Sequence, residues 1–203
     1  MRILKRGLIA IALWLIASIA LAALSPTDML QNATTNMLKA LQQNKATIKT
    51  NRGLVESLAR QILLPHIDIP TMSRLALGRD GWQKATPAQQ SEFTNQFTTL
   101  MIRTYSTALA SYTNQTVQYL PIRGGYEGKK QVQVDSQILQ SGGPAIPVSY
   151  KLVLRGNQWM VYDFSVDGVS LVQSFRSQFA QQLNQGGMPA LLASMTSHNA
   201  SRS

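Results

Sequence analysis

The sequence has 203 residues, of which 44% are hydrophobic and 14% charged, with 19 Lys plus Arg against 9 Asp plus Glu. These values fit one globular domain and exclude a collagenous, coiled-coil or wholly disordered chain. There is no cysteine, which excludes both a disulfide framework and a lipid anchor on a cysteine at the end of a signal peptide.

The first 22 residues have the pattern of a secretory signal peptide. A basic stub ends at Arg6, an apolar segment follows, and Ala20-Leu21-Ala22 supplies the small residues read by signal peptidase. We expect cleavage after Ala22, because the apolar segment is shorter than the ~20 residues that a membrane-spanning helix needs. Cleavage removes three basic residues and lowers the formal net charge from +10 to +7, so the exported chain stays basic.

The mature chain begins with a predicted helical stretch. Ser25 followed by Pro26 is typical of a helix start, and apolar residues repeat at helical spacing up to Leu41. We expect further helices over residues 54–63 and 70–77. Thr86-Pro87-Ala88-Gln89 predicts a capping box and opens the strongest helix, about 25 residues long, with an aromatic face.

After Asn114 the hydrophobic period changes from helical to two, which is typical of strands with one buried face. We expect strands over 117–119, 131–138, 146–154 and 160–166, with a tight turn at Gly156-Asn157. A helical stripe then runs from Val169 to Leu183 and ends at Gly186-Gly187, and a short helix follows over 189–195.

These elements predict an α+β fold: a four-stranded antiparallel curved sheet wrapped on a long helix, with additional N- and C-terminal helices. We expect a single domain over residues 23–195 and a disordered tail over residues 196–203.

The chemical motifs favour structural roles. Gly168-Val-Ser170 begins like a nucleophile elbow, but the second glycine is missing, so we expect Ser170 to bond locally at a helix start. No His, Cys or acidic spacing fits a metal site. We interpret Asp167 as the cap of the last helix, and we expect a structural ion pair between Asp163 and Arg176. An enzyme is therefore not expected, and neither is a cofactor.

The basic charge is scattered rather than clustered beside exposed aromatic residues, so nucleic acid is not expected as a partner. An anionic membrane surface, a lipid headgroup or an acidic protein fits the charge better. We expect a monomer.

Four segments carry a resemblance to a known family. The runs Leu63–Asp68, Leu77–Thr86 and Gln89–Phe93, and the dense block from Trp159 to Phe179, resemble the MlaC family of toluene-tolerance proteins, and the similarity covers essentially the whole mature chain. The resemblance implies a fold related to nuclear transport factor 2 and a periplasmic phospholipid carrier. Its implied partners are an outer-membrane lipoprotein complex and an inner-membrane ABC transporter complex with a lipid-binding substrate domain. The implied role is to maintain the lipid asymmetry of the outer membrane.

A phospholipid carrier needs an apolar cavity, and its candidate lining is the helix stripe that faces the sheet stripe. The resemblance implies that the phospholipid is cargo and that its headgroup lies near solvent, so we expect low headgroup selectivity. For each lining residue, a place in the ordinary core is at least as good an interpretation. Two other functions stay open: a secreted lipase or esterase, and a periplasmic protein-binding adaptor or chaperone. The predicted lipid-binding residues are Phe97, Met101, Tyr105, Val134, Val148, Tyr150, Leu152, Tyr162 and Phe164.

Overall fold

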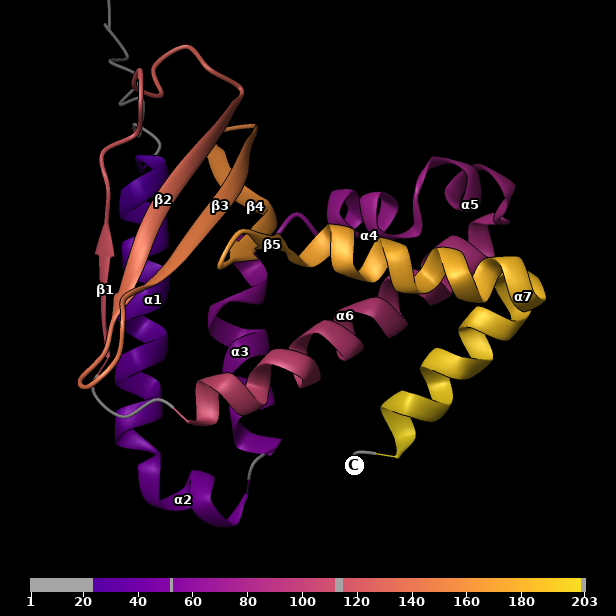
Figure 1. Ribbon diagram of the computed structural model, residues 1–203, viewed down its shortest axis with the longest axis horizontal. Coiled ribbons are helices and arrows are strands. Elements are labelled where there is room, and N and C mark those ends of the chain that lie inside the picture. Colours follow the sequence, from indigo (N-terminus) through magenta and orange to yellow (C-terminus); the bar gives the residue numbers. More distant parts are fainter. Residues whose placement is uncertain (1–23, 52, 112–114, 202–203) are drawn as a thin grey trace, which may run out of the picture.

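The computed structural model describes residues 24–51, 53–111 and 115–201, so the predicted signal peptide over residues 1–22 lies outside the described residues. The sheet and helix α1 stand at one end of the molecule, and α5 and the bend of α7 form the other end (Figure 1). The helices are α1 (Pro26–Gln43), α2 (Lys45–Thr50), α3 (Gly53–Ile62), the 3-10 helix η1 (Leu64–His66), α4 (Ile69–Leu77), α5 (Arg79–Lys84), α6 (Pro87–Ala110) and α7 (Leu171–Ala200).

Local hydrogen bonds fix where the predicted helices begin. The Ser25 hydroxyl accepts a bond from the Asp28 amide at 3.0 Å at the start of α1. The predicted capping box of α6 is present: the Gln89 amide donates to the Thr86 hydroxyl at 3.2 Å, and the Thr86 amide donates to Oε1 of Gln89 at 3.0 Å. These bonds satisfy amides that have no partner within the helix.

The sheet has five antiparallel strands in the order β1-β2-β3-β4-β5, rather than the four predicted. They are β1 (Thr116–Tyr119), β2 (Gln131–Leu139), β3 (Ile146–Arg155), β4 (Gln158–Val166) and β5 (Val169–Ser170). The predicted turn at Gly156-Asn157 joins β3 to β4, and Gly156 takes a positive φ of 57°.

The fifth strand arises because the chain reverses at Asp167 and Gly168, whose φ angles are 50° and 78°. Two positive φ angles in succession are typical of a tight hairpin turn. This turn pairs Val169 with Val166. The prediction that Asp167 caps the last helix is therefore wrong, because Asp167 lies in the turn and Ser170 is the N-cap of α7.

Helix α7 bends where the sequence predicted a stop. Gly187 has a φ of 67°, and Pro189 follows it inside the helix (Figure 1). Beyond the bend, α7 continues to Ala200, so the predicted disordered tail is wrong for residues 196–200. Asn199 is buried there, and its side-chain amide donates to the backbone carbonyl of Gln96 at 3.0 Å and to Oε1 of Gln96 at 2.7 Å. These bonds attach the end of α7 to α6.

The apolar side chains form two clusters. The first cluster joins helices α3, α4, α6 and α7 with the end of α1, and its centre is the group of rings Phe93, Phe97, Phe175 and Phe179, with centroids 5.2–5.9 Å apart. The second cluster lies between α1 and the sheet and contains Met29, Leu30, Val132, Val134, Leu152, Trp159 and Val161.

The helix against the sheet differs from the predicted one. Most of α6 packs against α3, α4 and α7, and it is α1 that supplies Met29 and Leu30 to the second cluster. The sheet therefore does not wrap the long helix α6. Helix α6 reaches the sheet near its C-terminal end, where the ring centroid of Tyr105 lies 5.3 Å from that of Phe164 on β4.

Candidate functional site

The second cluster covers one face of strands β2, β3 and β4. Val134 and Leu152 have no solvent exposure, and Val132 is Leu152's partner in the strand register. Met29 and Leu30 on α1 pack against this face of the sheet. A helix laid on a sheet with aliphatic and aromatic side chains between them has the chemistry to hold acyl chains.

A row of partly buried aromatic residues links the second cluster to the first. We call Tyr119, Tyr150, Phe164 and Tyr105 the aromatic row. The rings of Tyr119 and Tyr150 have centroids 6.4 Å apart, Tyr150 is paired with Phe164 across β3 and β4, and Phe164 contacts Tyr105. All four residues are intermediate in burial, whereas the centres of both clusters are fully buried. The aromatic row is thus less tightly buried than the centres of the two clusters.

A cleft of about 250 Å³ opens between α1 and β1, directly over Tyr119. Its lining carries hydroxyl, amide and apolar groups and no formal charge. We call it the α1 cleft; its lining residues are Gln31, Thr34, Thr35, Leu38, Gln115, Thr116, Val117 and Tyr119.

One side chain closes the floor of the α1 cleft. A hydrogen bond of 2.7 Å joins the hydroxyls of Tyr119 and Thr34, and the Tyr119 hydroxyl also donates to the backbone carbonyl of Leu30 at 3.3 Å. Burial raises the pKa of Tyr119 well above its usual range, and nearby Tyr150 raises it further, so the phenol stays neutral. Burial also raises the pKa of Tyr150. Tyr119 therefore fastens α1 to the edge of the sheet.

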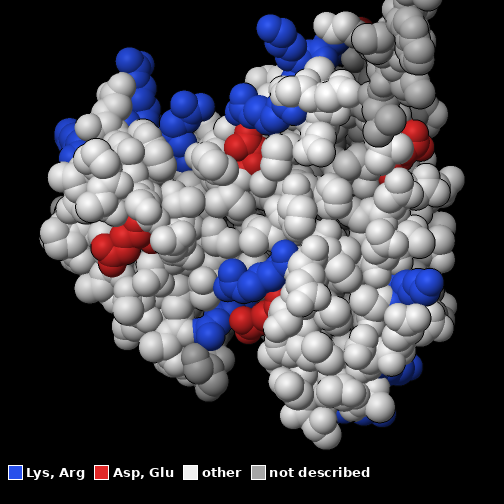
Figure 2. Space-filling model, turned by 180° about the vertical axis from the view of Figure 1, so that it is seen from behind, with Lys and Arg blue, Asp and Glu red and all other residues white. Residues whose placement is uncertain are grey.

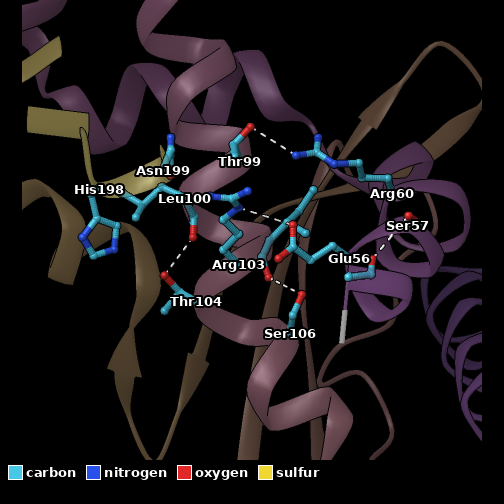
Figure 3. A network of polar contacts seen from close by, with 12 residues as sticks. Glu56, Ser57, Arg60, Thr99, Leu100, Arg103, Thr104, Ser106, His198 and Asn199 are labelled. Carbon is cyan, nitrogen blue, oxygen red and sulfur yellow. Dashed lines mark hydrogen bonds and ion pairs between the residues drawn. The ribbon is translucent and has the colours of Figure 1, made fainter. Parts of the chain in front are cut away.

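Polar contacts join helices α3 and α6, which belong to the first cluster (Figure 3). The Nε of Arg103 on α6 donates to Oε2 of Glu56 on α3 at 3.4 Å, and Nη2 of Arg60 donates to the Thr99 hydroxyl at 3.1 Å. The Arg103 and Glu56 side chains are only 17% and 26% exposed. Separating α3 from α6 would break a partly desolvated ion pair, so these two helices should move together.

The structure places the nine predicted lipid-binding residues in different environments. Phe97 and Met101 belong to the first cluster, and Tyr105 and Phe164 pack against it. Val134 and Leu152 belong to the second cluster, which Tyr150 contacts. Val148 is buried beside Ser136 in the strand register. Tyr162 is the unpaired extra residue of a bulge in β4 and belongs to neither cluster.

Sequence reasoning missed the contribution of α1 to this site. The helical stripe that contains Met29 was recognised, but nothing in the local pattern connects α1 to the sheet. Thr34 and Tyr119 are 85 residues apart in the chain, so their contact appears only in the folded protein.

The side chains that the sequence analysis considered for catalysis and ion pairing make structural contacts. Ser170 accepts a hydrogen bond from the Gln173 amide at 3.1 Å and donates to the Asp163 carboxylate at 2.9 Å, so the prediction of local bonding is confirmed. The predicted pair of Asp163 with Arg176 is wrong, because Asp163 pairs with Lys151 at 3.1 Å and Arg176 lies beside Gly78. Across the described ranges, no group of three or more His, Cys, Asp or Glu side chains is placed to hold a metal ion.

A second hollow, of about 620 Å³, lies between the N-terminal part of α6 and the C-terminal part of α7. Gln89 and Glu92 line one side, and Pro189, Leu192 and Thr196 line the other. It is separate from the aromatic row. Among the described helices, none has both the length and the hydropathy needed to cross a bilayer.

Comparison with known proteins gives a consistent family. The toluene tolerance protein ttg2D of Pseudomonas putida is 30% identical over 185 residues, with 91% of this chain and 85% of the relative covered. The intermembrane phospholipid transport system binding protein MlaC of Haemophilus influenzae is 28% identical over 192 residues, covering 90% and 86%.

A solved structure agrees in fold. The phospholipid-binding protein from Ralstonia solanacearum, determined in complex with a phospholipid, matches with a TM-score of 0.80 and 30% identity, covering 88% of this chain and 98% of that one. A sequence model of the family described as "MlaC protein" matches residues 31–197. The chain therefore belongs to the MlaC family.

Proposed function

We propose that this protein is a phospholipid carrier whose acyl-chain site is the aromatic row together with the second cluster. The observation that carries the proposal is the similarity in fold to a protein solved with a bound phospholipid. The apolar layer between α1 and the sheet supports it, because that layer joins buried aliphatic side chains to half-buried rings.

The energetics explain why a carrier is needed. Two acyl chains contain roughly 30 methylene groups, and exposing each to water costs ~0.8 kcal/mol, so free transfer through water is opposed by on the order of 24 kcal/mol. A protein lowers this barrier when it keeps the chains in an apolar interior. Methionines such as Met29 and Met101 suit this task, since a flexible thioether adapts to chains of different length.

Loading requires that the apolar layer opens. The α1 cleft lies at the edge where α1 meets β1, and one side chain, Tyr119, fastens that edge through Thr34 and Leu30. The Glu56–Arg103 pair holds α3 to α6. We therefore assign the opening motion to α1 and the sheet, with the acyl chains entering past Tyr119 and the headgroup remaining at the neutral rim of the cleft.

The wider role follows from the same proposal. The name of the Haemophilus influenzae relative describes intermembrane phospholipid transport. We propose that this chain acts in the periplasm after cleavage at Ala22 and shuttles phospholipid between an outer-membrane lipoprotein complex and an inner-membrane ABC transporter complex, which maintains outer-membrane lipid asymmetry. We propose no enzymatic step, because the Ser170 hydroxyl is engaged in capping α7.

Native mass spectrometry of the protein purified from the periplasm without detergent tests this proposal. The expected result is a mass increase that corresponds to phospholipid, with the lipid identified from the same sample by organic extraction. A protein that carries no lipid and takes none from vesicles would refute the carrier function. It would favour the protein-adaptor alternative.

A further inference from the structure

Three exposed lysines follow the α1 cleft along the chain. Lys39 lies one helical turn after Thr35, which lines the cleft, and Lys45 and Lys49 lie one turn apart on α2, which begins directly after α1. Helices α1 and α2 contain a single acidic residue, Asp28, near the opposite end of α1, where it accepts a hydrogen bond from Ser25. We call this surface the lysine face.

Figure 2 shows the molecule turned by 180° from the view of Figure 1, with the lysine face at the lower right. Blue groups lie along this edge, over α1 and α2, and no red group lies beside them there. No large hydrophobic side chain of α1 or α2 is exposed, since Ile48 on α2 is buried. The lysine face is therefore cationic and polar, without an apolar anchor.

A second basic surface lies at the other end of the molecule. Arg74 and Arg79 flank the end of α4, and Arg176 on α7 places its Nε 3.4 Å from the position that a Cβ on Gly78 would take. We call this surface the arginine corner. Leu75, 37% exposed, lies within it. Helices α1 and α5 lie at opposite ends of the long axis of the molecule (Figure 1), so the arginine corner is far from the α1 cleft.

The composition of the two surfaces points to different partners. Protein interfaces are enriched in arginine and in apolar anchors and depleted in lysine, and the arginine corner has this composition. Lysine is a compact, hydrated point charge that is attracted to an anionic bilayer without a shaped pocket. The lysine face has only such charges, and it adjoins the cleft through which the lipid would pass.

We propose that the lysine face is the surface by which this protein contacts an anionic phospholipid bilayer. Lys39, Lys45 and Lys49 hold the α1 cleft toward the headgroups, so that a lipid leaving the bilayer meets the opening between α1 and β1. The inference rests on the proposed carrier function, which it deepens by naming the surface that faces the membrane.

The expected binding is weak and depends on salt. A lysine near an anionic membrane surface contributes ~1 kcal/mol, which corresponds to about a fivefold change in affinity for each lysine and about 100-fold for three. Screening over a Debye length of about 8 Å at physiological ionic strength makes the contact reversible. A shuttle that must leave each membrane needs this weak contact.

The test measures flotation of the mature protein with vesicles of phosphatidylethanolamine and phosphatidylglycerol, and with vesicles of phosphatidylcholine alone. The variant carries Lys39→Gln, Lys45→Gln and Lys49→Gln. A matched control removes the same charge from the arginine corner through Arg74→Gln, Arg79→Gln and Arg176→Gln. Thermal unfolding of both variants verifies that they are folded, and native mass spectrometry measures their bound lipid.

The expected result is that the lysine variant loses about 100-fold in affinity for the anionic vesicles, while the arginine variant binds like the wild type. Equal losses in both variants would overturn the proposal, because net charge alone would then explain binding. Unchanged vesicle binding by the lysine variant would overturn it too. This holds even if the variant exchanges lipid more slowly with a membrane protein complex, because the lysines would then contact a protein rather than the bilayer. Lysine-dependent binding by a protein that holds no lipid would support the membrane surface and refute the carrier function.

Discussion

The Tyr119 hydroxyl offers the sharpest test of how the apolar layer opens. Tyr119→Phe keeps the ring against Tyr150 and removes the atom that bonds Thr34 at 2.7 Å and the Leu30 carbonyl at 3.3 Å. The Thr34 hydroxyl loses its partner but can donate to the carbonyl four residues earlier, which is that of Leu30. The Tyr150 hydroxyl, which also interacts with that of Tyr119, keeps Ser136 as a partner. No buried donor is then stranded, so the cost is the net value of a hydrogen bond, about 1 kcal/mol.

That free energy corresponds to an open state populated about fivefold more often. Hydrogen exchange should therefore show amides of α1 exchanging about fivefold faster in Tyr119→Phe, with amides of α6 unchanged, because the Glu56–Arg103 pair still holds α3 to α6. Uptake of a fluorescent phospholipid from vesicles should accelerate by the same factor, since a chain enters only the open state.

Tyr162→Phe is the matched control, because it removes a tyrosine hydroxyl on the same sheet from a residue outside both clusters. It should change neither exchange nor uptake. The reasoning fails if α1 exchanges at the wild-type rate in Tyr119→Phe, or if Tyr162→Phe accelerates uptake equally.

Three further predictions concern the clusters and the caps. Phe97→Ala should lower the free energy of unfolding by ~3–5 kcal/mol in urea titrations, because Phe97 is fully buried among rings of the first cluster, while native mass spectrometry still finds bound lipid. Phe164→Ala, in the aromatic row, should cost less stability but reduce lipid occupancy. The reverse ranking of the two variants would contradict the assignment of the lipid site. Burial by itself would raise the pKa of Asp68, but hydrogen bonds from Thr71 and Arg155 hold it below the ordinary 3.8, so the charged form stabilises the fold above pH 3.8. The difference in unfolding free energy between wild type and Asp68→Asn, on the order of 1 kcal/mol at neutral pH, should shrink as the pH falls below that value. A difference that stays constant with pH would argue against the ion pair of Asp68 with Arg155. Ser170→Ala should destabilise α7 by ~1 kcal/mol in thermal unfolding and leave any background ester hydrolysis unchanged, while loss of a measurable hydrolysis on this substitution would restore the esterase alternative.

The sequence determined the features that depend on neighbouring residues. The helix starts at Ser25 and Thr86 were predictable because a cap bonds an amide three residues away. The alternation of buried and exposed residues in β2 followed from the period of two. The glycine pair before a proline predicted a helix end, and the helix is interrupted at that place, at Gly187. All of these signals lie within a few positions of the structure they specify.

The features that depend on distant residues came from packing between segments far apart in the chain. The two-residue strand β5 is too short to have a period, and it exists because β4 offers an edge after the turn at Asp167. The helix that faces the sheet was mispredicted, because α1 and α6 both have apolar stripes and packing alone chose α1. The contact of Thr34 with Tyr119 spans 85 residues, so the fastening of the cleft that we assign to lipid entrance is a property of the fold rather than of any local segment.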